Sequence, residues 1–214
     1  MLAVAARQFR NFRVKPYSEA CERNRAPILD ALRSVFADCH TVLEIGSGSG
    51  QHAVYFGAQL PHLTWQTSDV PDAQAGIRAW LDEAHLPNVL PPLALDVDTA
   101  DWPHEKFDAV FSANTLHIMS WPEVERMFAG IARVLAARGV LAIYGPYNYG
   151  GRHTSDSNAG FDAWLRTRDA SSGIRDFENV DALARSYGLE LVHDFAMPAN
   201  NRLLVWRRLS ENAG

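Results

Sequence analysis

Three alternating glycines, Gly46, Gly48 and Gly50, form the pattern in this chain that most directly indicates a ligand site. A short apolar run with β-branched residues, residues 41–45, precedes them and is typical of a buried parallel strand, while the residues after them have the character of a helix. Glycine permits positive φ and lets the backbone approach a ligand closely. A strand, a glycine turn and a helix in this order predict a site for a nucleotide-type cofactor.

The glycine spacing and one acidic neighbour indicate which ligand the turn holds. A dinucleotide fingerprint places its third glycine at position 51, where this chain has Gln51. Glu44 lies inside the end of the preceding strand, and a carboxylate there repels a pyrophosphate and attracts an amino group or a sulfonium. A cationic ligand is therefore favoured. The alternative is a tight turn that serves only the packing of the strand against the helix.

Polar residues end each of the next three predicted strands. Asp69 ends residues 65–69 and lies 23 residues after Gly46, close to the spacing at which an acid binds ribose hydroxyls in such folds. Asp96 ends residues 89–96, and Asn114 ends residues 107–114. Because ligands of open α/β sheets bind at the carboxyl ends of the strands, we expect these side chains to share one site. Each acid alone is more typical of a helix cap or a solvated loop residue. Five elements in register, each ending in the expected residue type, favour the shared site instead.

The motif Glu-x-Gly-x-Gly-x-Gly at residues 44–50, with these strands in order, resembles the class I S-adenosylmethionine-dependent methyltransferases. The resemblance implies a Rossmann-like α/β fold, with a seven-stranded sheet in the order 3-2-1-4-5-7-6, the last strand antiparallel, and helices on both faces. It implies S-adenosyl-L-methionine as the cofactor and no metal. The implied cofactor residues are Glu44, Gly46, Ser47, Gly48 and Gly50 for the methionine part, Asp69 for the ribose, Asp96 and Val97 for the adenine, and Asn114 beside the transferred methyl group.

Hydrophobic periodicity and turn residues predict the remaining elements. Helices are expected over residues 18–37, 51–60, 71–84, 120–135, 156–170 and 176–188. Strands are expected over residues 139–144, 189–196 and 202–206, and the short connection between the last two implies antiparallel pairing. Residues 144–155 are predicted to form a polar loop. We expect one domain over residues 17–214, preceded by a flexible arm over residues 1–16.

Two residues after the fourth strand are candidates for catalysis of methyl transfer. His117 is the best-placed base for an acceptor hydroxyl or thiol, and its alternative is a hydrogen-bonded structural histidine at a helix entry. Asn114 would orient the substrate or else close the turn.

Three further segments are candidates for the substrate side of the same site. They contribute Arg23 and Asn24 before the first long helix, Tyr147 and Asn148 in the loop after the fifth strand, and Asn200 and Asn201 between the last two strands. Their alternatives are an exposed helix start, solvated loop residues, and a left-handed turn conformation at one of the two last asparagines.

Motifs outside the nucleotide half narrow the resemblance. Glu22-Arg23-Asn24, Gly145-Pro146-Tyr147, Gly173-Ile174-Arg175-Asp176 and Met197-Pro198-Ala199-Asn200-Asn201 are similar to one subfamily, the methyltransferase-like protein 26 group, which carries a domain of unknown function, number 938. This resemblance covers nearly the whole chain from about residue 16. It implies the fold and the cofactor and brings no substrate with it.

Composition restricts the partners. The net charge of -5 argues against a nucleic-acid binder, and residues 112–117 lack the run typical of enzymes that methylate nucleic-acid bases. Cys21 and Cys39 have no metal-ligand spacing, and no stretch has the length of a membrane span, so we expect a cytoplasmic protein with a small-molecule acceptor. The alternatives are a non-catalytic module that binds S-adenosylmethionine or its demethylated product, acting as a partner subunit, and, less favoured, a nicotinamide-dependent oxidoreductase. No oligomeric state is predicted.

Overall fold

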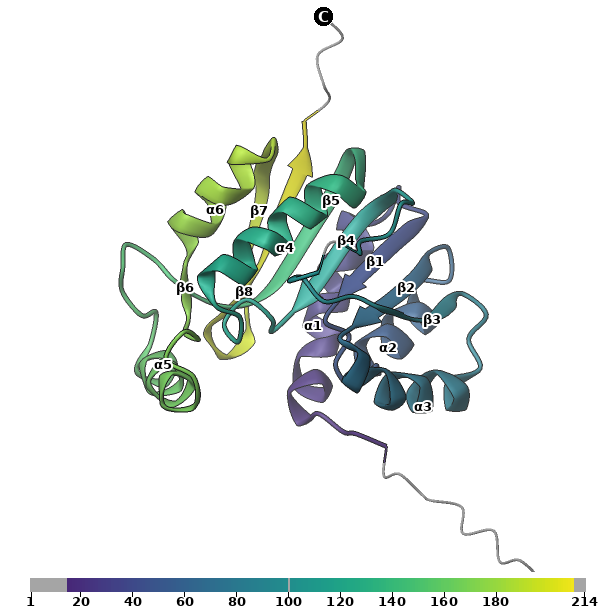
Figure 1. Ribbon diagram of the computed structural model, residues 1–214, viewed down its shortest axis with the longest axis horizontal. Helices are drawn as coiled ribbons and strands as arrows, with labels where there is room; N and C mark the ends of the chain where they lie inside the picture. The colour runs from purple at the N-terminus through teal and green to yellow at the C-terminus, as the bar shows by residue number, and fades with distance from the viewer. Residues whose placement is uncertain (1–14, 100, 210–214) are drawn as a thin grey trace, which may run out of the picture.

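The predicted strand order is confirmed by the computed structural model, which describes residues 15–99 and 101–209. The sheet runs β3 (Val89–Ala94), β2 (Thr64–Asp69), β1 (Thr41–Ile45), β4 (Phe107–Ala113), β5 (Leu135–Asn148), β8 (Asn201–Arg208) and β7 (Leu189–Met197) (Figure 1). The first five are parallel, and β8 is antiparallel to both β5 and β7. A two-residue strand, β6 (Arg175–Asp176), pairs with the end of β5 and was not predicted, so the expected sixth and seventh strands are β7 and β8. All but the last two residues of the predicted arm, 1–16, lie outside the described residues.

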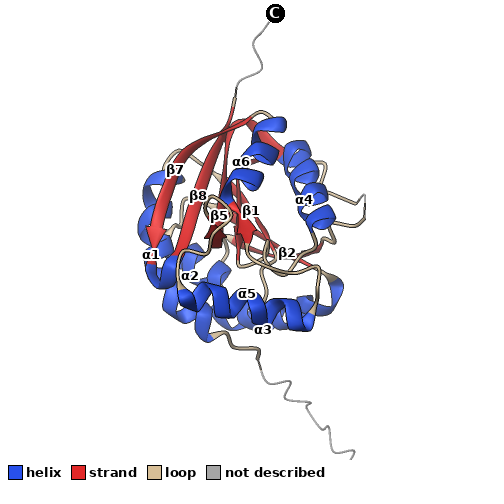
Figure 2. Cartoon of the chain, turned by 90° about the vertical axis from the view of Figure 1, so that its left-hand side faces the viewer, coloured by secondary structure: helices blue, strands red, loops and turns tan. Residues whose placement is uncertain are grey.

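Helices cover both faces of the sheet, as expected (Figures 1 and 2). On one face lie α1 (Glu19–Val35), α2 (Gln51–Gln59) and α3 (Gln74–Ala84), where Leu32 and Phe56 are fully buried against β1 and β4. On the other face lie α4 (Trp121–Val134) and α6 (Phe177–Ser186), which bury Phe128 and Val180. The remaining helix, α5 (Asp156–Arg168), contributes to the cavity described below.

Local signals explain where the helices next to the site begin. Ser18 caps α1 by accepting a hydrogen bond from the Cys21 amide, which fixes the approach of the first helix. Ser120 and Glu123 form the predicted capping box at the start of α4. Residues 71–73 form a single 3-10 turn instead of the first turn of α3.

The prediction of a loop at residues 144–155 was wrong for its first five residues. Strand β5 continues to Asn148 because β8 pairs with it as far as Pro146, and β6 pairs with its last two residues. Tyr144 and Tyr147 are buried along this extension. Pairing partners far away in the sequence therefore overrode a local composition that is typical of a loop.

Candidate functional site

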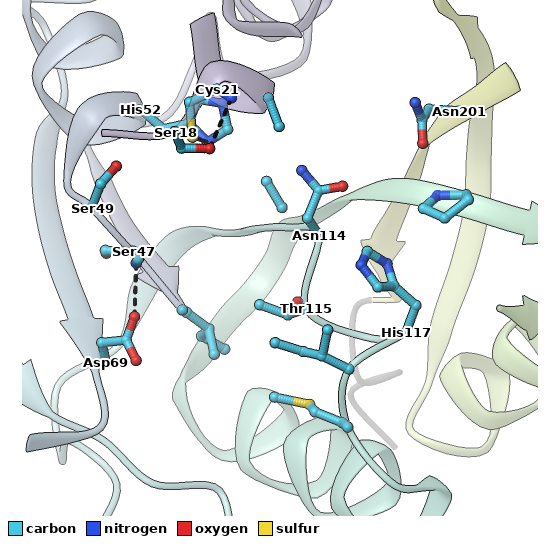
Figure 3. Close-up of a pocket in the computed structure, with 18 of the residues that line it drawn as sticks. Ser18, Cys21, Ser47, Ser49, His52, Asp69, Asn114, Thr115, His117 and Asn201 are labelled. Carbon is cyan, nitrogen blue, oxygen red and sulfur yellow. Dashed lines mark hydrogen bonds between the residues drawn. The ribbon is translucent and has the colours of Figure 1, made fainter. Parts of the chain in front are cut away.

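A single large cavity lies at the carboxyl ends of the parallel strands. Its volume is about 860 Å³, and its walls come from the glycine turn, from the residues that follow β2, β3 and β4, and from α1 and α5 (Figure 3). Of the predicted site residues, the structure brings together at this cavity Arg23, Gly46, Ser47, Gly48, Asp69, Asp96, Val97, Asn114, His117 and Asn201. Residues from six separate segments that sequence analysis placed in one site thus line the same cavity.

The glycine turn has the backbone that its sequence predicts. Gly46, Gly48 and Gly50 have φ values of 72°, 58° and 91°, which favour glycine. A Cβ at Gly46 would lie 2.5 Å from Thr115 Cγ2, and one at Gly50 would lie 3.1 Å from the Ile77 Cα. The turn is therefore packed closely against the residues after β4 and against α3, and neither glycine tolerates a side chain.

Glu44 supports this turn from inside the protein and does not line the cavity. Its side chain is buried, and one carboxylate oxygen, Oε2, accepts hydrogen bonds from Ser47 Oγ at 2.9 Å and Trp65 Nε1 at 3.0 Å. Burial raises the pKa of Glu44 to about 7 against these two hydrogen bonds, which lower it. The carboxyl thus braces Ser47 at the base of the turn, and its charge state changes near neutral pH.

Asp69 and Asp96 follow β2 and β3 and face the cavity from its other side. Asp69 accepts hydrogen bonds from the Gly48 amide at 2.7 Å and from the Val70 amide at 2.8 Å, one on each oxygen (Figure 3). Burial raises the pKa of Asp69, and these two bonds oppose the shift. Each carboxylate oxygen keeps a second lone pair for a ligand hydroxyl. Asp96 accepts the Asp98 amide at 2.9 Å, which fixes the turn that exposes it to the cavity.

Asn114 and His117 stand together on the turn after β4 (Figure 3). Asn114 has a φ of 61°, a conformation that asparagine tolerates better than most residues. Its backbone N–H donates to the Tyr144 carbonyl at 2.8 Å. His117 is 6% exposed, and its ring lies edge-on to Phe161 of α5, with ring centroids 5.2 Å apart. Burial, and then the charge of Arg175, lower the pKa of His117 to about 4, so the imidazole is neutral at pH 7.

A second histidine on the cavity wall was missed by sequence analysis. His52, in the first turn of α2, lies with its Nε2 2.7 Å from Asn24 Oδ1 and its Nδ1 3.8 Å from Cys21 Sγ. An asparagine oxygen only accepts, so Nε2 carries the proton and Nδ1 presents its lone pair toward Cys21 and the cavity. Burial lowers the pKa of His52 to about 4. The signal in the sequence that could have identified His52 as a site residue is its position directly after the glycine turn.

Asn24 and Arg23 therefore differ in position although they are neighbours. Asn24 is buried beneath the cavity wall and holds His52, whereas Arg23 is exposed, lines the cavity and pairs with Glu19 at 3.3 Å.

Three predicted substrate residues besides Asn24 lie outside the cavity. Tyr147 is 1% exposed in the core, and its hydroxyl has no hydrogen-bond partner within the part of the chain that the structure describes. Asn148 is also buried; it lies 2.8 Å from His153 Nδ1 and donates to the Ile174 carbonyl, so it fastens β5 to neighbouring segments. Asn200 lines a smaller adjoining cavity and has the predicted left-handed conformation, with a φ of 56°. Asn201 lines both cavities.

Residues 15–99 and 101–209 hold neither a cluster of metal ligands nor a membrane-spanning helix. These residues contain no group of three or more histidine, cysteine or acidic side chains that could hold a metal ion. No helix among them is long and apolar enough to cross a membrane.

Solved structures of similar fold include O-methyltransferase family proteins and an S-adenosylmethionine-dependent methyltransferase, SibL. An O-methyltransferase family protein from Burkholderia thailandensis superposes with a TM-score of 0.79 at 21% identity, over 90% of this chain and 58% of its own. An O-methyltransferase family 2 protein from Planctomyces limnophilus, in complex with apigenin, gives a TM-score of 0.79 at 16% identity, over 89% and 58%. PigF with SAH gives 0.76 at 17% identity, over 87% and 56%. The chain spans a little over half the length of these proteins, and it has the class I methyltransferase fold.

The sequence itself matches one family model over almost its whole described length. The model is described as "Protein of unknown function (DUF938)" and matches residues 15–208. This confirms the subfamily that the motifs predicted. The chain belongs to the DUF938 family of proteins of unknown function.

Proposed function

We propose that this protein is an S-adenosylmethionine-dependent methyltransferase that acts on a small-molecule acceptor. The observation that carries the proposal is the arrangement of one cavity. Its glycine turn has three left-handed residues, the turn is hydrogen-bonded to Asp69, and Asp96 and His117 stand on the same walls. Parallel strands present their carboxyl ends at one edge of a sheet, which is where ligands of this fold bind.

The residues present fit the cofactor. The glycine turn leaves no room for side chains at Gly46 and Gly50 and exposes Gly48, so its backbone is open to a ligand. Asp69 is placed to accept ribose hydroxyls, and Asp96 with the backbone of Val97 to accept and donate to an adenine ring. When bound, S-adenosylmethionine supplies an electrophilic methyl group on a sulfonium. Glu44, buried behind Ser47, adds negative potential at the glycine-turn end of the cavity when its carboxyl is ionised.

On the acceptor side, His117 has the properties of a general base. A neutral imidazole accepts a proton, and the low pKa of His117 keeps it neutral throughout the physiological range. Phe161 fixes one side of the ring, and Asn114, three residues earlier, supplies an amide to orient the acceptor. Apolar residues of the same wall, including Ile118, Met119 and Pro146, favour an acceptor with an apolar body and one ionisable hydroxyl.

The similar structures support this reading. Their names include O-methyltransferases, and one holds apigenin, a small molecule. A small-molecule acceptor is consistent with the net charge of -5, which disfavours nucleic acid. A cytoplasmic location stays a prediction. The alternative is a module that binds the cofactor or its product without turnover, and a nicotinamide-dependent oxidoreductase remains the less favoured one, because Gln51 replaces the third glycine of that fingerprint.

Calorimetric titration with S-adenosylmethionine tests the proposal directly. We expect the wild type to bind and Asp69→Ala to lose most of the affinity, while Asp30→Ala, at an exposed position of α1, binds like the wild type. Binding of a nicotinamide dinucleotide in preference to S-adenosylmethionine would contradict the cofactor assignment. His117→Gln separates the two remaining readings once an acceptor is found: an enzyme loses methyl transfer and keeps cofactor binding, whereas a binding module shows no transfer in either protein.

A further inference from the structure

The turn that carries His117 is held from outside by one short segment. Residues 172–175, which we call the carbonyl clamp, donate hydrogen bonds to all four carbonyls of residues 116–119. The pairs are Arg175 Nε with the Leu116 oxygen at 3.1 Å, Gly173 N with the His117 oxygen at 2.9 Å, Ser172 Oγ with the Ile118 oxygen at 3.0 Å, and Arg175 Nη2 with the Met119 oxygen. The two segments are more than fifty residues apart in the sequence.

Such a set of contacts fixes a conformation that the turn does not fix by itself. Within residues 116–119 the local backbone contact is a single bond from the Ile118 amide to the Thr115 carbonyl, at 3.0 Å. An external segment that supplies a donor to each of the four carbonyls determines where the turn lies. His117, Ile118 and Met119 line the cavity, so the clamp sets the shape of the wall without entering it.

The clamp is itself anchored on the elements that surround the cavity. The Ile174 amide donates to Asp162 Oδ1 of α5 at 2.7 Å, and Phe161, the neighbour of Asp162, packs edge-on to the His117 ring. Arg175 and Asp176 pair as β6 with the end of β5. One helix therefore contacts the ring on one side and holds the clamp on the other.

Arg175 also brings a positive charge that no carboxylate among the described residues pairs with directly. Burial and the nearby Arg166 lower the pKa of Arg175, and the charges of Asp162 and Glu123 oppose that shift. The hydrogen bonds of Arg175 go to the carbonyls of Leu116, Met119 and Ser171, and none of the ion pairs among the described residues includes it. Its charge is the second cause, after burial, of the low pKa of His117. The remaining ionisable groups that line the cavity are Cys21, Arg23, His52, Asp69, Asp96 and Glu123.

We infer that Arg175 is a positioning residue for His117: together with Ser172 and Gly173 it holds residues 116–119 by their carbonyls so that the imidazole faces the cavity. The inference rests on the proposed function only in the use that catalysis makes of His117. The contacts themselves are properties of the protein without any ligand, so they are measured without one.

The test combines an NMR titration of the His117 ring with hydrogen exchange of the Ile118 amide, which is bonded within the turn, and of the Gly173 amide, which donates to the His117 carbonyl, both on the full chain without ligand. His117→Gln assigns the ring signal. Three variants separate the effect of charge from that of geometry. Arg175→Gln removes both the charge and the guanidinium group that bonds two carbonyls, whereas Arg175→Lys keeps the charge and loses the guanidinium. Ser172→Ala removes one neutral donor. Arg185→Gln, at an exposed arginine of α6 that pairs with Asp181, is the matched control.

In Arg175→Gln we expect the pKa of His117 to rise by roughly 0.5–1 unit and exchange of the two amides to accelerate about tenfold or more. Arg175→Lys should accelerate exchange and leave the pKa low, Ser172→Ala should accelerate exchange without moving the pKa, and Arg185→Gln should change neither. An unchanged pKa together with unchanged exchange in Arg175→Gln overturns the inference. If that variant does not fold, unchanged exchange in both Arg175→Lys and Ser172→Ala overturns it. Failure of the wild type to bind S-adenosylmethionine would refute the proposed function. The pKa of His117 and the amide exchange are measured without ligand, so they would still decide the positioning role of Arg175.

Discussion

Glu44→Gln should make the protein progressively more stable than the wild type as the pH rises. The folded protein holds the proton of Glu44 tightly, because the pKa of this buried group rises from its ordinary value of 4.5 to about 7. A raised pKa means that the stabilisation is complete below pH 4.5 and is lost as the pH rises through about 7, where folding forces a charge to be buried. Glutamine has nearly the same shape and does not titrate.

The magnitude follows from the size of the shift. The change of the pKa from 4.5 to about 7 corresponds to about 3 kcal/mol at most, and about 2–3 kcal/mol of it falls between pH 5 and pH 8. The amide oxygen of glutamine accepts the bonds from Ser47 and Trp65 as the carboxylate does, and any cost of its second N–H is the same at every pH. His52 and His117, whose lowered pKa values destabilise the folded state below about pH 6.5, contribute equally to both proteins and cancel in the difference.

The assay is equilibrium unfolding in urea at pH 5, 6, 7 and 8 and constant ionic strength. The quantity of interest is the free energy of unfolding of Glu44→Gln minus that of the wild type, and we expect it to grow by about 2–3 kcal/mol across the series. Glu190→Gln, at an exposed position of β7, should give a flat difference. A difference for Glu44→Gln that stays constant within about 0.5 kcal/mol would refute the reasoning, since a carboxyl that titrates alike in both states has no linkage to folding.

Three other substitutions or profiles test separate features. Gly46→Ala should cost about 1–3 kcal/mol in unfolding free energy and abolish cofactor binding, because the new Cβ meets Thr115 2.5 Å away at a φ of 72°. Its control is Gly160→Ala, on an open face of α5, which should be neutral or stabilising by up to about 1 kcal/mol; equal effects at both positions would contradict the packing argument. The kcat/KM of a methyl transfer that uses His117 as base should be constant above pH 5 and fall as the pH drops through about 4, because only the neutral ring accepts a proton; a fall centred near 6.5, the ordinary value of a histidine, would show that burial does not lower the pKa of the base. Ser120→Ala should lower the free energy of unfolding by about 1 kcal/mol through loss of the helix cap, measured in urea, and no loss would mean that the capping box does not stabilise α4.

The part of the site that was predictable from the sequence is the part encoded locally. A glycine turn needs glycine at given positions, and an acid at the end of a parallel strand must reach the edge where ligands bind. Gly46, Gly48, Asp69 and Asp96 accordingly line the cavity as expected. His52 also had a local signal, since the first turn of the helix after the glycines faces the same cavity, but it was not used.

What was not predicted depends on contacts between distant segments. Residues 144–148 look like a polar loop, yet β8 and β6 pair with them and bury Tyr147 in the core. The hydrogen bonds of the carbonyl clamp could not be predicted from the sequence, although Gly173-Ile174-Arg175-Asp176 was identified as a motif. A backbone carbonyl is the same in every residue, and only the fold brings Arg175 to it. Asn24 was predicted on the substrate side, whereas the structure places it beneath the wall as the partner of His52.

The position of β8 has a consequence for the synthesis of the protein. The last strand in the sequence is an inner strand of the sheet, and its pairing joins residues as far apart as Val140 and Arg207. Until the ribosome releases residues 201–208, one edge of β5 presents unpaired N–H and C=O groups, the kind of edge that recruits other chains. The nascent protein therefore carries the glycine turn beside an open sheet edge until β8 is synthesised and pairs with β5.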